Sequence, residues 1–180
     1  LEQAEKGLMA SPGHRRNILN KWHRKVSLGI AYDKERLDLV QHFEGDYIDF
    51  SIRPTILDSN LSMTGNATIG IFKNVTLHYD PLPQPLSLEK LSAPPYDNAY
   101  GLGEYVGVIL SPPSPGYYYT DLSPNDVVAI TWDIKSDGSF SIKADASSIL
   151  GTGNGVYTVV LWVDIGGEYV GISNYSMFIN

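Results

Sequence analysis

The 180-residue sequence contains no cysteine. This absence excludes disulfide bonds, thiolate zinc sites and a cysteine nucleophile. No stretch approaches the roughly 20 apolar residues of a membrane-spanning helix, so no transmembrane segment is expected. The first residues are polar and helical in pattern, unlike a signal peptide. Because the chain begins with Leu1 rather than Met, we expect that an upstream segment has been removed.

Basic residues become scarce after residue 50. Residues 1–50 carry eight Lys and Arg against eight Asp and Glu, whereas residues 51–180 carry five against twelve. The net charge of −7 therefore arises entirely from the second segment. An acidic surface repels phosphate groups, so nucleic acid is not an expected partner. The change in charge predicts two domains, residues 1–50 and residues 51–180.

Two short helical patterns precede a chain that otherwise consists of strand and turn signals. Apolar spacing predicts a helix over residues 2–10, and Ser11 followed by Pro12 predicts a capped second helix. Alternation predicts a hairpin from residues 26–32 and 37–43. The remaining predicted strands are residues 47–52, 60–64, 66–72, 74–79, 105–110, 126–134, 139–144, 156–164 and 168–179. Many short strands at this spacing indicate a sandwich or a barrel. Residues 80–104 are Pro-rich and predict a long loop, a kind that is often functional or mobile.

Three sequence blocks in the first segment point to a known superfamily. Residues 11–19 read SPGHRRNIL, residues 29–32 read GIAY and residues 40–43 read VQHF. In this order they closely resemble the microbial branch of the CAP/SCP superfamily, which includes cysteine-rich secretory proteins, insect antigen 5 and plant pathogenesis-related proteins. The resemblance implies an extracellular protein, and it implies that residues 1–50 are the C-terminal fragment of an α-β-α CAP sandwich.

The resemblance also implies a role for His14. In such proteins the motif histidine lines a cavity with a second histidine and two acidic residues, where several members hold a divalent metal. Only His14 carries over, since neither Glu2 nor Glu5 falls clearly on an expected acidic position. A stable zinc site needs three or four ligands. His14 is therefore an incomplete metal site, and a divalent metal is expected only in an intact parent protein. No cofactor and no catalytic residue are predicted.

A second resemblance lies at the end of the chain. Residues 155–162, GVYTVVLW, and residues 169–179 are similar to the last two strands of an immunoglobulin or fibronectin-type module. This resemblance implies that Tyr157 forms a tyrosine corner, with its hydroxyl bonded to the loop before it. Trp132 is expected to fill the core. The predicted fold class is therefore mainly β: a helical and hairpin CAP remnant followed by an antiparallel immunoglobulin-like sandwich.

Three further patterns each have a functional and a structural interpretation. Four Asn-x-Ser/Thr triplets are either glycosylation sites or a product of a β-protein rich in Asn, Ser and Thr; they begin at Asn60, Asn66, Asn74 and Asn174. A set of aromatic residues is either a platform for sugars or a set of cross-strand core pairs; it comprises Tyr117, Tyr118, Tyr119, Trp132 and Trp162. Four carboxylates are either calcium ligands or, as their spacing favours, solvated turn residues; they are Asp133, Asp137, Asp145 and Asp164.

Three functions follow from these observations. The first is an extracellular or cell-surface CAP-family protein without catalytic activity in this chain, whose β-domain serves adhesion or presentation. The second is a carbohydrate- or cell-wall-binding module that uses the tyrosines and the loop over residues 80–104. The third is a secreted hydrolase whose site lies largely in a missing N-terminal half. The expected partner is a protein, lipid or carbohydrate ligand, and homo-oligomerisation is an open alternative.

Overall fold

The computed structural model describes residues 2–35, 37–82 and 102–179. The chain is mainly β and divides into two compact units, Leu1–Asp46 and Tyr47–Asn180. The division falls slightly before the boundary near residue 50 that the charge distribution predicts. It falls there because strand β3 (Ile48–Leu57) pairs only with a strand of the second unit.

The first unit consists of two helices and a hairpin at the predicted positions. Helix α1 spans Glu2–Ala10 and helix α2 spans Pro12–Ile18. Strands β1 (Lys25–Tyr32) and β2 (Leu37–Glu44) form an antiparallel two-stranded sheet.

One face of this hairpin is almost entirely apolar. Because residues opposite each other share a face, the register from Val26 opposite Phe43 to Tyr32 opposite Leu37 gathers the apolar side chains together. The members of this apolar hairpin face are Val26, Leu28, Ile30, Tyr32, Leu37, Leu39, Gln41 and Phe43. Leu28 is 60% exposed, and no described residue from 2 to 46 is buried. An isolated hairpin is marginally stable in water. The first unit therefore lacks a core of its own.

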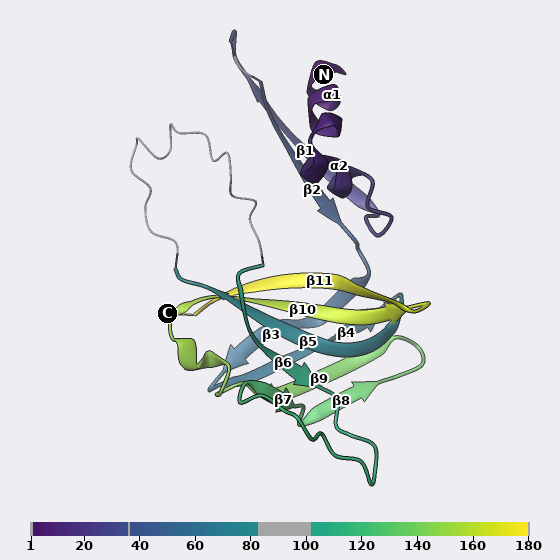
Figure 1. Cartoon of the computed structure of the whole chain (residues 1–180), viewed down its shortest axis with the longest axis vertical. Helices are drawn as coiled ribbons and strands as arrows, with labels where there is room; N and C mark the ends of the chain where they lie inside the picture. Colours follow the sequence, from purple (N-terminus) through teal and green to yellow (C-terminus); the bar gives the residue numbers. More distant parts are fainter. Residues whose placement is uncertain (1, 36, 83–101, 180) are drawn as a thin grey trace. The chain divides into compact units, whose positions relative to one another are not determined.

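The second unit is built from two sheets that pack face to face (Figure 1). One sheet has the order β3-β4-β9-β8, in which β4 is Asn60–Ala67, β9 is Ser139–Asp145 and β8 is Thr131–Ile134. The other has the order β11-β10-β5-β6-β7, in which β11 is Glu168–Ile179, β10 is Gly155–Ile165, β5 is Ile71–Asp80, β6 is Glu104–Leu110 and β7 is Asp126–Val128. All pairings are antiparallel except that of β6 with β7. A short 3₁₀ helix, η1 (Leu150–Thr152), precedes β10.

Alternating side chains from both sheets fill the core. Phe72 of β5 packs against Phe140 of β9 with ring centroids 5.1 Å apart, and Phe50 of β3 contacts Tyr175 of β11. The fully buried aliphatic side chains include Leu61, Met63, Val75, Leu77, Ile109, Ile142 and Leu161. The expectation that Trp132 fills this core is met only in part: Trp132 lies opposite the buried Ile142 and so on the inner side of its sheet. Trp132 is only half-buried, because it lies on the edge strand β8.

Four strand predictions had the wrong boundaries. The strand predicted over residues 47–52 continues to Leu57, and the strand predicted over residues 66–72 crosses the turn between the end of β4 at Ala67 and the start of β5 at Ile71. Gly65 signals a turn in the sequence, but it continues β4. A side chain there would place its Cβ 2.5 Å from the carbonyl oxygen of Asp49, so the glycine allows two backbones to approach. The predicted strand over residues 126–134 is two strands in different sheets. The Ala129 N–H donates to Leu110, whereas the Ile130 N–H donates to Lys143, so the chain crosses between the sheets at this point.

The predicted loop over residues 80–104 lies mostly outside the described residues. Its first residue ends β5 and its last begins β6. The predicted hairpin, and the strands over residues 105–110, 139–144, 156–164 and 168–179, are confirmed with small changes at their ends.

Tyr157 is fully buried at the start of β10, as the tyrosine-corner pattern predicts. Its hydroxyl donates to the carbonyl oxygen of Gly153 at 2.8 Å, and the carbonyl oxygen of Leu150 lies 3.4 Å away. The expectation of a buried ring with a hydroxyl bonded backward to the preceding loop is confirmed.

Replacing Tyr157 with phenylalanine is expected to lower the free energy of unfolding by about 1–3 kcal/mol. The ring would still fill its site, but the Gly153 carbonyl would lose its donor inside the protein. Urea denaturation followed by circular dichroism measures the change. Tyr175→Phe is a suitable control, since Tyr175 lies half-buried on β11. A Tyr157→Phe variant as stable as the parent chain would contradict a structural role for the hydroxyl.

Candidate functional site

His14 lies on α2, exposed to solvent, and its Nδ1 is 2.9 Å from the Ser11 hydroxyl. Ser11 occupies the N-cap position and its backbone is extended, but its side chain makes no hydrogen bond to the helix backbone. The predicted side-chain cap is therefore wrong: the hydroxyl pairs with His14 instead. Pro12 follows at the first helical position, as predicted.

Metal ligands do not gather around His14 in the described part of the chain. Glu2 forms an ion pair with Lys6 at 2.9 Å. Over residues 2–35, 37–82 and 102–179, the structure holds no group of three or more His, Asp or Glu side chains placed to share a metal ion. His14 therefore belongs to no such group among these residues.

The four predicted glycosylation sites all place asparagine on an outer sheet face. In the three triplets on β4 and β5 the middle residue is buried, so alternation points the asparagine outward; these middle residues are Leu61, Ala67 and Val75. Asn66 and Asn174 are exposed, whereas Asn60 and Asn74 are half-buried. The Asn66 Nδ2 donates to the Asp137 carbonyl oxygen at 3.1 Å. Glycosylation of these four asparagines stays a prediction.

The predicted aromatic platform is not assembled. Trp132 lies on β8 in the four-stranded sheet, whereas Trp162 lies on β10 in the five-stranded sheet. The three consecutive tyrosines lie in the segment between β6 and β7, and Tyr118 is 86% exposed. Trp132 and Trp162 instead lie in different surroundings.

Trp162 belongs to an aromatic pair on the outer face of the five-stranded sheet. Its ring stacks on Tyr169 of β11 with centroids 4.8 Å apart and planes inclined by 3°. The Trp162 Nε1–H donates to the Thr76 hydroxyl at 2.8 Å, and the Tyr169 hydroxyl donates to the Asn74 side chain. Both side chains therefore form a hydrogen bond to a residue of β5, although Tyr169 lies on β11, two strands away. Tyr105 of β6 continues the surface, with its ring 5.9 Å from that of His78.

The outer face is rich in aromatic and uncharged polar side chains, and two carboxylates border it: Asp164 lies directly opposite Tyr169, and Asp126 lies opposite Val108. Register and alternation place the following side chains there: Asn74, Thr76, His78, Tyr105, Val108, Thr158, Val160, Trp162, Tyr169, Asn174 and Ser176. Tyr105 is 54% exposed and Tyr169 is 50% exposed. Partial burial, with Asp126 nearby, raises the pKa of Tyr105, and burial raises the pKa of Tyr169. Both phenols therefore stay neutral at physiological pH. The sequence prediction missed these two tyrosines, because only strand pairing brings them together.

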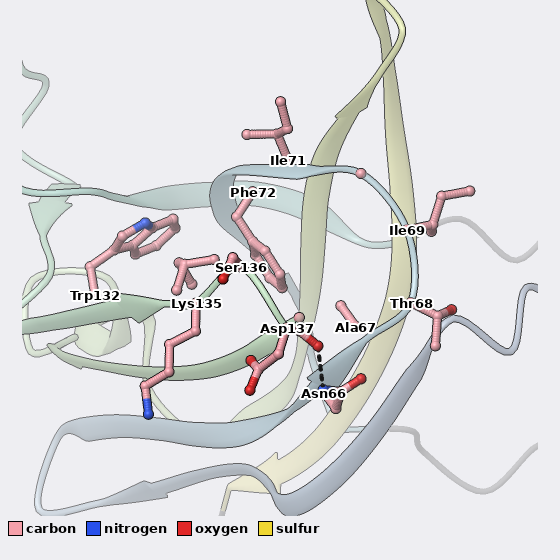
Figure 2. A pocket seen from close by; sticks show the side chains of 13 residues that line it. Asn66, Ala67, Thr68, Ile69, Ile71, Phe72, Trp132, Lys135, Ser136 and Asp137 are labelled. Atoms are coloured by element: carbon pink, nitrogen blue, oxygen red, sulfur yellow. Dashed lines mark hydrogen bonds between the residues drawn. The ribbon is translucent and has the colours of Figure 1, made fainter.

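Trp132 lines a hollow at one end of the sandwich (Figure 2). The hollow has a volume of about 750 Å³ and lies between the β4–β5 turn and the β8–β9 turn. Phe72 and Ile134 add apolar surface, and Lys135 and Asp137 lie at the β8–β9 turn. Figure 2 shows the Asn66 side chain bonded to this turn, which links the two walls.

The aspartates considered as calcium ligands are mainly turn residues, as their spacing favours. Asp137 accepts hydrogen bonds from the backbone and hydroxyl of Ser139, and these bonds lower its pKa. Backbone N–H donors likewise lower the pKa of Asp145 and Asp164. Asp133 lies 4.0 Å from the Lys135 ammonium group. These carboxylates stabilise turns rather than converging on one point.

Comparison with protein-family models, curated proteins and solved structures finds no match for the chain. Within the described residues, no helix has the length and apolar character needed to cross a membrane. Function is therefore inferred from the surfaces described above.

Proposed function

We propose that this chain belongs to an extracellular protein that acts by binding. An immunoglobulin-like sandwich carries the adhesive surface, and the first unit is the C-terminal part of a CAP-type domain. The observation that carries the adhesive role is the aromatic outer face of the five-stranded sheet.

The strand order supports an immunoglobulin-like second unit. Variable-type immunoglobulin domains have nine strands, with ABED in one sheet and C and its two additional strands beside F and G in the other. In chain order, β3 to β11 take the same places. Tyr157 at the start of β10 then corresponds to the tyrosine corner of strand F. Two features depart from that pattern: the chain has no cysteine pair, and β6 pairs in parallel with β7.

The exposed hairpin supports a CAP-type first unit. The apolar hairpin face has no buried member, although seven of its eight residues are apolar. A surface of this composition needs a packing partner to contribute to stability. The SPGHRRNIL resemblance implies one, since a CAP-type domain covers such strands with the rest of its α-β-α sandwich.

The composition of the outer face supports an adhesive role. Protein interfaces are enriched in Tyr and Trp. Tyr105, Trp162 and Tyr169 all lie on this face, and two carboxylates, Asp126 and Asp164, lie beside the aromatic residues. Tyr105 and Tyr169 are each held by a neighbouring ring while half of their surface stays accessible. Rings held in this way lose little conformational entropy when a partner binds.

Replacing both Tyr105 and Tyr169 with serine is expected to weaken adhesion about tenfold or more, the loss typical of interface anchors. Beads coated with the intact chain would be tested for retention on cell-envelope preparations of the producing organism. The control is Tyr117→Ser with Tyr118→Ser, which removes two tyrosines that are 73% and 86% exposed in another segment. Circular dichroism would verify that each variant is folded. Equal retention of the outer-face variant and the parent would contradict the proposal.

A further inference from the structure

We propose that the hollow beside Trp132 binds a gluco-configured pyranose unit of a neutral oligosaccharide. This inference rests on the proposed binding role of the sandwich and assigns it a ligand class. The site is separate from the outer face, because Trp132 lies on β8 of the four-stranded sheet.

The hollow provides an aromatic surface for stacking. Trp132 is half-buried, so part of its ring is accessible from the hollow (Figure 2). Phe72 is buried beside it and is held against Phe140, with ring centroids 5.1 Å apart. A gluco-configured pyranose carries its hydroxyls around the ring edge and its C–H groups on the two faces. Such a face packs on an aromatic ring, and tryptophan gives the largest area for this contact.

The polar group of Trp132 is available to a ligand. A partly buried indole N–H normally has a hydrogen-bond partner. The Trp162 Nε1–H follows this rule by donating to Thr76. The Trp132 Nε1–H has no such bond to any residue that the structure describes, and it is not sealed from solvent. A sugar hydroxyl at the edge of a stacked ring would supply the acceptor.

The rim of the hollow supplies further polar groups of mixed character. Lys135 contributes a cation and Asp137 an anion, so the rim has no net charge from this pair. The Asn66 Nδ2 is bound to the Asp137 carbonyl oxygen, and this bond leaves the Asn66 Oδ1 as an acceptor. Ser136 adds a hydroxyl. A mixed rim suits the many weak donors and acceptors of a neutral sugar better than a charged ligand.

The walls of the hollow are fixed before any ligand binds. The Ala67 N–H donates to the Gly138 carbonyl oxygen at 2.9 Å, and the Asn66 side chain adds a second link between the same two turns. A volume of about 750 Å³ falls in the range of small-molecule sites, roughly 300–1,000 Å³. Preformed walls reduce the entropic cost of binding.

The test is isothermal titration of the intact chain with two probes, the β-1,4-linked tetrasaccharides of glucose and of N-acetylglucosamine. At least one probe is expected to bind with one-to-one stoichiometry. Trp132→Ala should weaken binding about tenfold or more. The affinity of Trp132→Phe should lie between those of the parent chain and Trp132→Ala, because phenylalanine keeps a ring but lacks the N–H. Ser136→Glu is a second variant: Ser136 is exposed and lines the hollow, so the substitution spares the core while it places a carboxylate at the hollow.

The control is the Tyr105→Ser, Tyr169→Ser variant, which should bind the sugar as the parent chain does. The inference is overturned if neither tetrasaccharide binds, or if binding is unchanged in both Trp132→Ala and Ser136→Glu. Adhesion that still depends on Tyr105 and Tyr169 would then leave the proposed function intact. Sugar binding that depends on those tyrosines instead of Trp132 would also overturn the site assigned here.

Discussion

Truncating Leu77 to alanine is expected to lower the free energy of unfolding by about 2–5 kcal/mol. Leu77 lies on β5, the central strand of the five-stranded sheet, and none of its surface is exposed. The substitution removes apolar contacts and leaves a cavity that the rigid sheet cannot fill by collapse. Urea denaturation followed by far-ultraviolet circular dichroism measures the difference.

The matched control is Leu28→Ala in the first unit. Leu28 also lies on a strand, but 60% of it is exposed on the apolar hairpin face. Its truncation is expected to change the free energy of unfolding by less than about 0.5 kcal/mol, as is usual for surface positions. If the two substitutions destabilised the chain equally, Leu28 would be packed in solution and the contrast between the two units would be wrong.

Replacing Gly138 with alanine is expected to destabilise the second unit by about 2–5 kcal/mol. Two effects add. Gly138 has a φ of +87°, which costs a residue with a side chain roughly 1–2 kcal/mol. The new Cβ would also meet the carbonyl oxygen of Ala67, and relieving such overpacking costs about 1–3 kcal/mol. Thermal unfolding monitored by circular dichroism gives the size of the effect.

Gly116 separates the two effects. Its φ of +85° is nearly the same, but a Cβ there would meet no atom within 4 Å. Gly116→Ala is therefore expected to cost only the backbone term, about 1–2 kcal/mol. Equal losses at Gly116 and Gly138 would show that the β8–β9 turn can move away from Ala67. The walls of the Trp132 hollow would then not be preformed.

Local patterns were enough to predict much of the fold. The hairpin over residues 25–44, the helices and most later strands follow from alternation and turn signals, which act over a few residues. Tyr157 was also predictable, because its hydroxyl bonds to a carbonyl only four residues earlier. Predictions failed where a distant strand decides the outcome. Gly65 permits a close approach to Asp49, and residues 126–134 divide between two sheets that the sequence does not reveal.

The candidate sites depend even more on distant pairing. Trp162 and Tyr169 were both visible in the sequence, but their stacking depends on the β10–β11 register. Tyr105 joins them only through β5, which separates β6 from β10. Trp132 and Trp162 were grouped as one platform, yet β8 and β10 belong to different sheets. Residue type predicted an aromatic binding surface, and topology determined which rings could form one.

The energetic difference between the two units links the fold to the proposed function. The second unit has a core drawn from both of its sheets, so it can present its outer face as a stable surface. The first unit has no buried side chain among its described residues. Its amphipathic hairpin therefore needs a further surface to become stable, as a part of a larger CAP-type domain would.

Amide hydrogen exchange on the intact chain tests this difference most directly. Amides of β5 and β10 lie in the centre of a sheet and should exchange only with global unfolding, whereas those of β1 and β2 should exchange orders of magnitude faster through local opening. Mass spectrometry of peptides from each strand resolves the two classes. The account predicts slow exchange in β5 and β10 together with fast exchange across residues 25–44. Equal protection of the hairpin and the sandwich would contradict it.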